Sequence, residues 1–180
     1  GSTDYVTEVD RKVENIIFEE IKSFYPEHNF LGEESGEEIN NSNVTWILDP
    51  IDGTTNFING FPHYCVSLCA SVDGIPSHGV IIDPTRREEF SASKGKGAWC
   101  NNKRLRVSKR HQMINCLIGT GIPYADNAHE NYLGEIDIIS KNSCGLRRIV
   151  TASLDLAFVA SGKLDGFWER DLNIWDVCSG

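Results

Sequence analysis

The sequence lacks several features that would place it in common classes of protein. No apolar run is long enough to cross a bilayer, and no signal-peptide pattern opens the chain. The cysteines form no CxxC pair, which argues against a zinc or redox motif, and they are too sparse for a disulfide scaffold. We therefore expect a cytoplasmic protein with no membrane partner. We expect buried thiols at Cys65, Cys69, Cys100, Cys116, Cys144 and Cys178.

Basic charge is also scarce. The chain has 17 Lys and Arg residues against 26 Asp and Glu residues, which gives a formal net charge of −9. A non-specific nucleic-acid binder needs a basic field, so we expect no direct binding of nucleic acid. A phosphate substrate is compatible with the acidic balance, because metal ions can reverse the local charge of an acidic site.

The order of predicted elements indicates one domain over residues 1–180, because no linker or repeat divides the chain. Antiparallel hairpins stand beside helices, an α+β or mixed α/β arrangement. Helices are predicted from Thr7 to Pro26 and over 127–141 and 151–160, the last capped by Thr151. Strands are predicted over 30–31, 44–48, 64–72, 75–82, 88–93, 116–120 and 164–169.

The most informative segment reads WILDPIDGTTNF, in which Asp49 and Asp52 lie at the end of a predicted buried strand. Two crowded acids repel each other unless cations lie between them. Carboxylate oxygens suit Mg²⁺, Mn²⁺ or Ca²⁺. Thr54 follows Gly53 and can begin a helix whose free N–H groups point at an anion. Taken alone, the Asp-Pro-x-Asp-Gly pattern fits an ordinary Asp-Pro turn equally well.

Four motifs, in matching order and spacing along the whole chain, carry a family resemblance. They are Asp4 to Asp10, Gly32 to Ser35, Trp46 to Phe57 with Pro62 and Ser67, and Trp175 to Gly180. Together they resemble the inositol monophosphatase family of lithium-sensitive, magnesium-dependent phosphatases. The resemblance implies a layered α-β-α-β-α sandwich, α/β with α+β strand pairing, that lacks the family's N-terminal helices and C-terminal quarter. It also implies a homodimer.

The resemblance assigns a ligand set for two or three Mg²⁺ ions, position by position. Glu33, Asp49 and the Ile51 carbonyl would bind the first ion, and Asp49, Asp52 and Asp176 the second. Glu33 and, through water, Asp10 would bind a weaker third ion. Asp176 is expected at the N-cap of a helix.

The resemblance also assigns catalytic and substrate contacts. Glu33 and Thr54 would position the attacking water, beside the shared ligand Asp49. The N–H groups of Gly53 and Thr54 would hold the phosphate, which Asp52 and Asp176 adjoin. Ala152 and Glu169 fall where the family contacts the alcohol part of its substrate.

The implied reaction is metal-dependent hydrolysis of a small phosphorylated polyol, with inositol 1-monophosphate as the first candidate. The run Asp-Gly-Thr-Thr-Asn-Phe resembles the inositol-phosphatase branch. One alternative is a phosphatase of another sugar phosphate, such as fructose 1,6-bisphosphate. A second alternative is a catalytically weak regulatory or binding protein on the same fold. Phosphate release with and without Mg²⁺ separates that second alternative from the enzymes.

Some residues depart from the family pattern or have an ordinary structural interpretation. Val150 stands where the family usually has glycine, so its side chain could narrow the alcohol pocket. Cys178 and Ser179 replace small residues of similar size near Asp176. His63 is expected to pack. Core positions are expected for Trp46, Trp99 and Trp168.

Overall fold

A computed structural model describes residues 2–122 and 129–180 of the chain. The helices are α1 (Ser2–Phe24), α2 (Thr54–Ile58), α3 (His129–Asn142), α4 (Ala152–Ala160), α5 (Ile174–Val177) and the 3-10 helix η1 (Met113–Asn115). The strands are β1 (Asn29–Gly32), β2 (Gly36–Glu38), β3 (Val44–Asp52), β4 (Cys65–Val72), β5 (Ile75–Asp83), β6 (Glu88–Ser93), β7 (Gly97–Cys100), β8 (Lys103–Arg104), β9 (Leu117–Thr120), β10 (Gly145–Arg147) and β11 (Gly166–Trp168). The helix predicted over 127–141 is α3, and its first two residues lie outside the described part.

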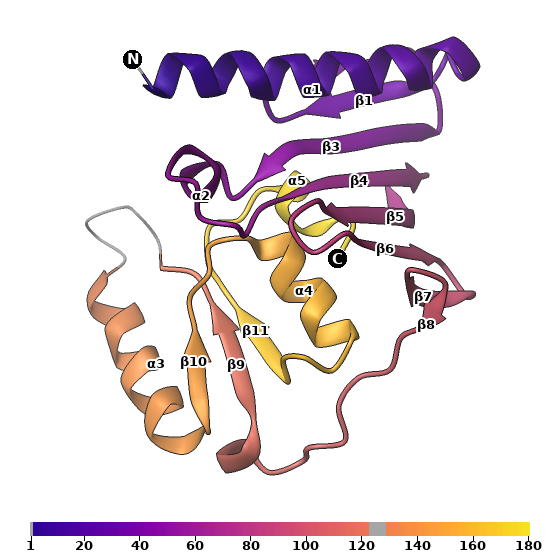
Figure 1. The fold of residues 1–180 in the computed structure, drawn as a ribbon. Coiled ribbons are helices and arrows are strands. Elements are labelled where there is room, and N and C mark those ends of the chain that lie inside the picture. The colour runs from indigo at the N-terminus through magenta and orange to yellow at the C-terminus, as the bar shows by residue number, and fades with distance from the viewer. Residues whose placement is uncertain (1, 123–128) are drawn as a thin grey trace.

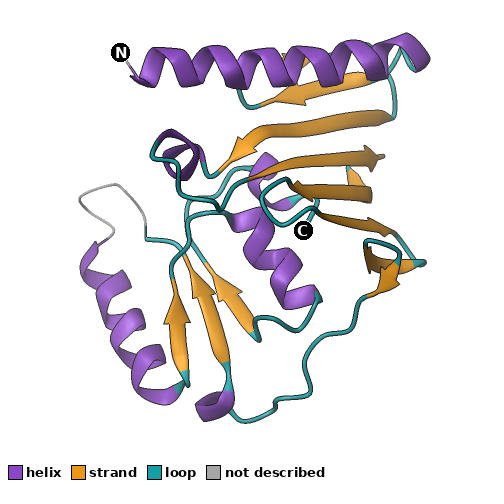
Figure 2. Cartoon of the chain, viewed as in Figure 1, coloured by secondary structure: helices purple, strands orange, loops and turns teal. Residues whose placement is uncertain are grey.

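Two sheets and three helical layers alternate, as the resemblance implied (Figure 1). The large sheet has the order β2-β1-β3-β4-β5-β6-β7-β8, in which β1 and β3 pair in parallel and the other neighbours pair antiparallel. The strands β10, β9 and β11 form a second, parallel sheet. Figure 2 shows α1 above the large sheet, α4 between the sheets, and α3 beside the small sheet. None of the described helices is long and apolar enough to span a bilayer.

The buried face of α1 is partly acidic. Asp10, Glu14 and Phe18 lie four residues apart on the face that meets the sheet, and each is less than 7% exposed. The apolar side chains of Ile16 and Phe24 are instead 60% and 69% exposed. The helix therefore turns two carboxyl groups, rather than a purely apolar stripe, toward the strands.

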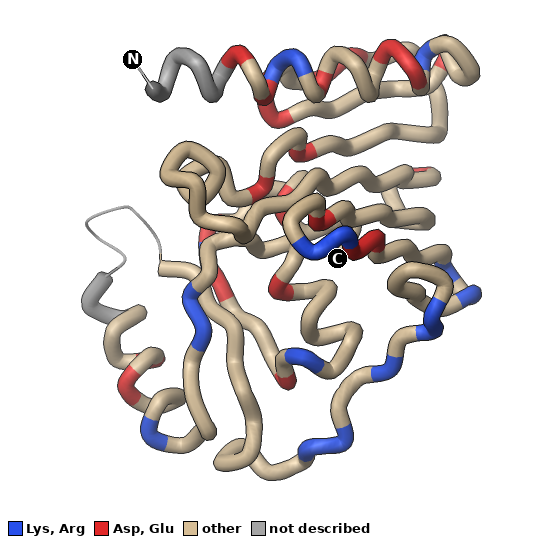
Figure 3. Tube along the Cα trace, in the orientation of Figure 1, with Lys and Arg blue, Asp and Glu red and all other residues tan. Residues whose placement is uncertain are grey.

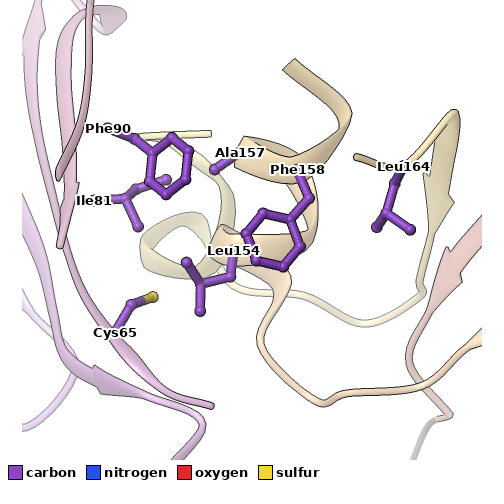
Figure 4. Close-up of a cluster of buried hydrophobic side chains, with 7 residues drawn as sticks. All are labelled: Cys65, Ile81, Phe90, Leu154, Ala157, Phe158 and Leu164. Atoms are coloured by element: carbon purple, nitrogen blue, oxygen red, sulfur yellow. The ribbon is translucent and has the colours of Figure 1, made fainter. Parts of the chain in front are cut away.

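The central core forms around α4. Leu154, Ala157 and Phe158 of this helix pack between the large sheet, through Ile81 and Phe90, and the loop that leads to β11 (Figure 4). Fully burying aliphatic or aromatic side chains of this size contributes about 1.5–3 kcal/mol each. Because α4 is buried by both sheets, its N-terminus is held firmly at the edge where β3 ends.

The structure corrects several local predictions. Trp99 is 38% exposed and Cys144 is exposed, so neither is a core residue. Thr151 does occupy the N-cap position of α4, but its side chain makes no capping hydrogen bond. The N-cap of α5 is Asn173, and Asp176 is the third residue of that helix, with which Asn173 forms a capping box.

Candidate metal and phosphate site

A bulge in β3 brings the two aspartates of the central motif to one face. Residues three apart in a regular strand point to opposite faces. Here Asp49 pairs with Ser67 and Asp52 pairs with Cys65, so two residues of β3 stand opposite one residue of β4. Pro50, which has no N–H to donate, lies inside this irregularity. Both carboxyl groups are consequently directed to the side of the sheet that α4 and α5 cover.

Glu33 reaches the same place from the turn after β1. Its backbone N–H donates to the Leu48 carbonyl at 3.2 Å, and its carboxyl lies close to that of Asp49. The buried carboxylate of Glu14 accepts hydrogen bonds from the backbone N–H groups of Glu34 at 3.1 Å and Ser35 at 2.9 Å. Glu14 on α1 therefore fixes the turn that carries Glu33.

The starts of α4 and α5 complete the cluster. The N–H of Ser153 donates to Asp52 Oδ2 at 2.8 Å, and its hydroxyl donates to the Asp176 carbonyl at 2.9 Å. Asp176 Oδ2 accepts the N–H of Asn173 at 2.6 Å. Ser153 thus ties the Asp52 carboxyl of β3 and the backbone of α5 at Asp176 to the buried helix α4.

The carboxyl groups of this cluster all resist ionisation. Burial first, and then the charges of Asp52 and Glu33, raise the pKa of Asp49. Burial likewise raises the pKa values of Asp52 and Asp176, against the hydrogen bonds they accept. Glu33 as a whole is exposed, but its carboxyl group faces the cluster. Partial burial of that group, followed by the charge of Asp176, raises its pKa. Among the described residues, no Lys, Arg or His side chain forms an ion pair with Glu33, Asp49, Asp52 or Asp176, so the cluster is short of positive charge.

The segment after Asp52 is shaped to approach a ligand closely. Gly53 has φ +94°, and a Cβ there would lie 2.5 Å from Thr151 Cγ2, so only glycine fits. Thr54 then begins α2, and its hydroxyl donates to the Ile51 carbonyl at 2.9 Å. The backbone N–H groups of this first turn are the expected phosphate contacts.

The remaining predicted site residues lie around this cluster. Asp10 adjoins Glu33 and Glu34, its Oδ1 is buried without a hydrogen-bond partner among the described residues, and burial raises its pKa to about 7. Burial and the charge of Asp176 raise the pKa of Glu169, which lies against Gly121. Ala152 is 5% exposed and offers no polar side-chain atom.

The donor chemistry fits a hard divalent cation. Carboxylate oxygens and the Ile51 carbonyl are ligands that Mg²⁺ accepts. Within the described residues, no three acidic, histidine or cysteine side chains are already arranged around a common point. Instead Asp49 Oδ1, Asp52 Oδ2 and Asp176 Oδ2 accept the backbone N–H groups of Ile51, Ser153 and Asn173. A bound cation would compete with these N–H groups for the carboxylate oxygens.

Comparison with known proteins decides the family. The sequence model of the inositol monophosphatase family matches residues 1–180. The chain belongs to the inositol monophosphatase family. A protein named inositol-1-monophosphatase from Rhizobium meliloti is 45% identical over 100% of this chain and 68% of its own length. A protein named Nus factor SuhB from Pseudomonas aeruginosa is 45% identical over 98% of this chain and 68% of its own length.

Solved structures of the family share the fold. The inositol monophosphatase of Anabaena superposes with a TM-score of 0.92 at 36% identity, covering 99% of this chain and 72% of that one. The extragenic suppressor protein suhB of Bartonella henselae gives a TM-score of 0.91 at 44% identity, covering 94% of this chain and 67% of that one. The predicted layered fold is therefore confirmed.

Val150 shows why the inositol monophosphatase family usually has glycine at this position. Its φ is +65°, in the left-handed region that β-branched residues avoid. This conformation costs a residue with a Cβ roughly 1–2 kcal/mol. The chain carries this strain at the residue just before Thr151, next to the start of α4.

We expect Val150→Gly to stabilise the protein. Relief of strain outweighs the larger loss of backbone entropy, leaving a net gain of about 0.5–1 kcal/mol and a melting temperature higher by about 2–3 °C. Differential scanning calorimetry measures this shift. The control is Val159→Gly in the ordinary helical backbone of α4, which should lower the melting temperature. A lower melting temperature for Val150→Gly as well would show that the strain is absent.

Asp155 is a buried acid beside the site that sequence reasoning did not single out. It lies on α4, is 1% exposed, and its Oδ1 has no hydrogen-bond partner among the described residues. Burial, followed by the charges of Asp52 and Glu169, raises its pKa to about 8. The folded protein therefore keeps this carboxyl protonated over a pH range in which the unfolded chain ionises it.

We expect Asp155→Asn to make the protein more stable at high pH. The folded pKa is about 8 against an ordinary value of 3.8, so wild-type stability falls as pH rises from 4 to 8. The amide removes that loss, which is on the order of a few kcal/mol because one pKa unit corresponds to about 1.4 kcal/mol. Thermal melts at pH 5 and pH 8.5 test this, with Asp73→Asn in an exposed turn as the control. An equal gain at both pH values would contradict the assignment.

Sequence reasoning missed three residues that hold the predicted ligand residues in place. They are Glu14, Ser153 and Asn173, which bind the turn of Glu33, the carboxyl of Asp52 and the carboxyl of Asp176. Glu14 carried a usable signal, because an acid four residues before Phe18 falls on the buried face of α1. Ser153 acts through its backbone N–H on Asp52, which is distant in the sequence. Asn173 acts through a capping box with Asp176. Neither contact has a signal in the local sequence pattern.

Proposed function

We propose that this member of the inositol monophosphatase family hydrolyses a small phosphate monoester with the help of Mg²⁺. The observation that carries the proposal is the convergence of Glu33, Asp49, Asp52 and Asp176 from three separate segments, with raised pKa values and, among the described residues, no ion pair to a basic side chain. A protein accumulates such uncompensated acids at a cost, and perturbed carboxyls in one cluster are typical of functional sites. The relatives named inositol-1-monophosphatase support the same reaction.

The proposed ligand set is the one that the family resemblance implies. Glu33, Asp49 and the Ile51 carbonyl would hold one ion, and Asp49, Asp52 and Asp176 a second. Asp10, through water, and Glu33 would hold a weaker third. When bound, Mg²⁺ supplies positive charge that neutralises the phosphate and lowers the pKa of water.

The chain's own residues orient the reaction. The Thr54 hydroxyl donates to the Ile51 carbonyl, so its lone pairs are left to accept a hydrogen bond from the attacking water. The Glu33 carboxylate would take up the proton that this water loses. The N–H groups of Gly53 and Thr54 would bind the phosphate oxygens, and Glu169 would accept hydrogen bonds from the hydroxyls of the alcohol.

Inositol 1-monophosphate is the first candidate substrate. The test is release of inorganic phosphate from a panel that includes inositol 1-monophosphate and fructose 1,6-bisphosphate, with and without Mg²⁺. Turnover of inositol 1-monophosphate that requires Mg²⁺ supports the proposal. Preference for fructose 1,6-bisphosphate would support a phosphatase of another sugar phosphate. No turnover of any ester would support a regulatory or binding protein, and some relatives of the chain are named Nus factor SuhB. A homodimer and a cytoplasmic location remain predictions.

We also expect Li⁺ at millimolar concentration to inhibit phosphate release in the presence of Mg²⁺. The expectation rests on the resemblance to a family of lithium-sensitive phosphatases. A titration of LiCl at constant ionic strength, balanced with KCl, measures it. Unchanged phosphate release across the titration would place the protein outside the sensitive branch.

A further inference from the structure

The net charge of −9 conceals a strong separation of charge along the chain. Residues 86–110 contain nine of the 17 Lys and Arg residues but two of the 26 Asp and Glu residues. All nine of these basic residues are exposed. The expectation of no nucleic-acid binding rested on the net charge, which says nothing about such a local field.

Seven of these residues form a continuous basic stripe along one edge of the molecule. Figure 3 shows the blue segments following one another from the turn between β6 and β7, through β8, and down the segment that leads to η1. We call this set the basic stripe: Lys94, Lys96, Lys103, Arg104, Arg106, Lys109 and Arg110. β8 is the edge strand of the large sheet, so no further strand of the described chain covers it.

The basic stripe is almost free of acidic partners. Among the described residues, Arg110 pairs with Asp165 at 2.8 Å, and the other six residues form no ion pair. Adjacent like charges repel one another, and an anionic ligand that spans them relieves this repulsion and releases counterions. The charge pattern therefore fits an extended polyanion better than a single small anion.

An exposed aromatic ring adjoins the stripe. Trp99 on β7 is 38% exposed, and the Arg104 guanidinium lies over its ring at 5.8 Å. Trp99 also lines a polar hollow with Arg87, Ser91, Asn101, Asn102 and one acid, Glu89. An acidic protein surface would use the charges of this region but not the exposed ring. Single-stranded nucleic acid uses both, because its phosphates follow a basic groove and its bases stack on aromatic side chains.

We propose that the basic stripe and Trp99 form a binding site for single-stranded nucleic acid. The phosphates lie along the segment from Lys94 to Arg110, and one base stacks on Trp99 beside Arg104. Recognition depends on charge and stacking and is tolerant of sequence. The site is separate from the carboxylate cluster, which lies at the end of β3 and the starts of α4 and α5.

The test is fluorescence anisotropy of a labelled single-stranded RNA of mixed sequence with the full chain. The matched variants are Lys103→Gln/Arg104→Gln/Arg106→Gln in the stripe and Lys12→Gln/Lys22→Gln/Lys141→Gln elsewhere, which change the net charge equally. The stripe variant should weaken binding by about tenfold or more and reduce the slope of log K against log salt by about 2. The control variant should stay within about twofold of the wild type. Circular dichroism confirms that both are folded.

Stacking is tested separately from charge. Trp99→Ala should weaken binding by about tenfold, and Trp99→Phe should restore most of the loss, because base stacking needs an aromatic face rather than an indole N–H. Polyglutamate of equal charge should compete poorly. No binding at 50 mM salt, equal losses in the two triple variants, or competition by polyglutamate as strong as by RNA would each overturn the proposal. The last of these results would indicate an acidic protein as the partner.

Discussion

Asp49→Asn is expected to reduce the rate of phosphate release by more than about a hundredfold at saturating Mg²⁺. This loss exceeds the effect of removing a group that only supports a metal ligand. Asp49 is the carboxylate that two ions would share, so one neutral amide weakens both. The fold should survive, because the side-chain oxygen of asparagine can still accept the Ile51 N–H that Asp49 Oδ1 accepts at 3.0 Å. Enzyme assays and circular dichroism measure the two effects independently.

The same substitution is expected to stabilise the protein when Mg²⁺ is chelated. Burial and the neighbouring acids raise the pKa of Asp49, so its charged form opposes folding above the ordinary carboxyl pKa. Asparagine removes that charge. Added Mg²⁺ should then stabilise the variant less than it stabilises the wild type, because a ligand that binds the folded protein more weakly stabilises it less. Asp155→Asn is the control: it also replaces a buried titratable carboxyl with an amide, yet should keep its activity. Near-normal turnover of Asp49→Asn would contradict the role of this residue.

Glu33→Gln is expected to lower kcat by about 10²–10⁴-fold, the usual contribution of a positioned general base. The carboxyl of Glu33 lies against that of Asp49, on the turn that Glu14 fixes. The amide keeps the size of the side chain but cannot take up a proton. Because the group also contributes to ion binding, the Mg²⁺ dependence of kcat should be measured for each variant.

The adjacent residue provides a matched control. Glu34 belongs to the same turn, but its carboxylate pairs with the exposed side chain of Arg11 at 3.4 Å. Glu34→Gln should therefore change kcat by less than about threefold, as expected for the loss of a surface ion pair. Equal effects of the two substitutions would mean that the turn as a whole matters, and not the position of the Glu33 carboxyl.

Local sequence patterns predicted much of the fold. The alternation and turn residues around β4, β5 and β6 are short-range signals, and β6 lies where predicted, over Glu88–Ser93. The strand pattern ended at Leu48, however, whereas β3 runs on to Asp52 through Pro50. Proline normally interrupts a ladder, and only the bulge opposite Val66 makes it acceptable there.

The parallel sheet was beyond such patterns. β10 has three residues, and its pairing with β9 joins segments that α3 separates. Pairing between distant short strands is specified by tertiary packing and leaves little trace in periodicity. Asp176 was misplaced by three residues within its helix for a similar reason, because Asn173 and Asp176 satisfy each other in a capping box.

The candidate site was predictable in its members but not in its geometry. The family motifs named the four carboxyls that converge, and the pKa shifts of these groups reflect their mutual proximity. No sequence pattern showed that the bulge turns Asp49 and Asp52 to one face, or that Ser153 links Asp52 to Asp176. The link from Ser153 to Asp52, for example, joins residues that are 101 positions apart in the chain.

The most direct test of the acid cluster as a metal site is anomalous X-ray diffraction from crystals of the protein soaked in Mn²⁺, which substitutes for Mg²⁺ among oxygen ligands. We expect an anomalous peak between the carboxylates of Asp49 and Asp52, within bonding distance of Glu33 or Asp176, and loss of that peak in Asp49→Asn crystals. Peaks confined to surface carboxylates such as Glu37 or Asp137, with none at the end of β3, would contradict the assignment.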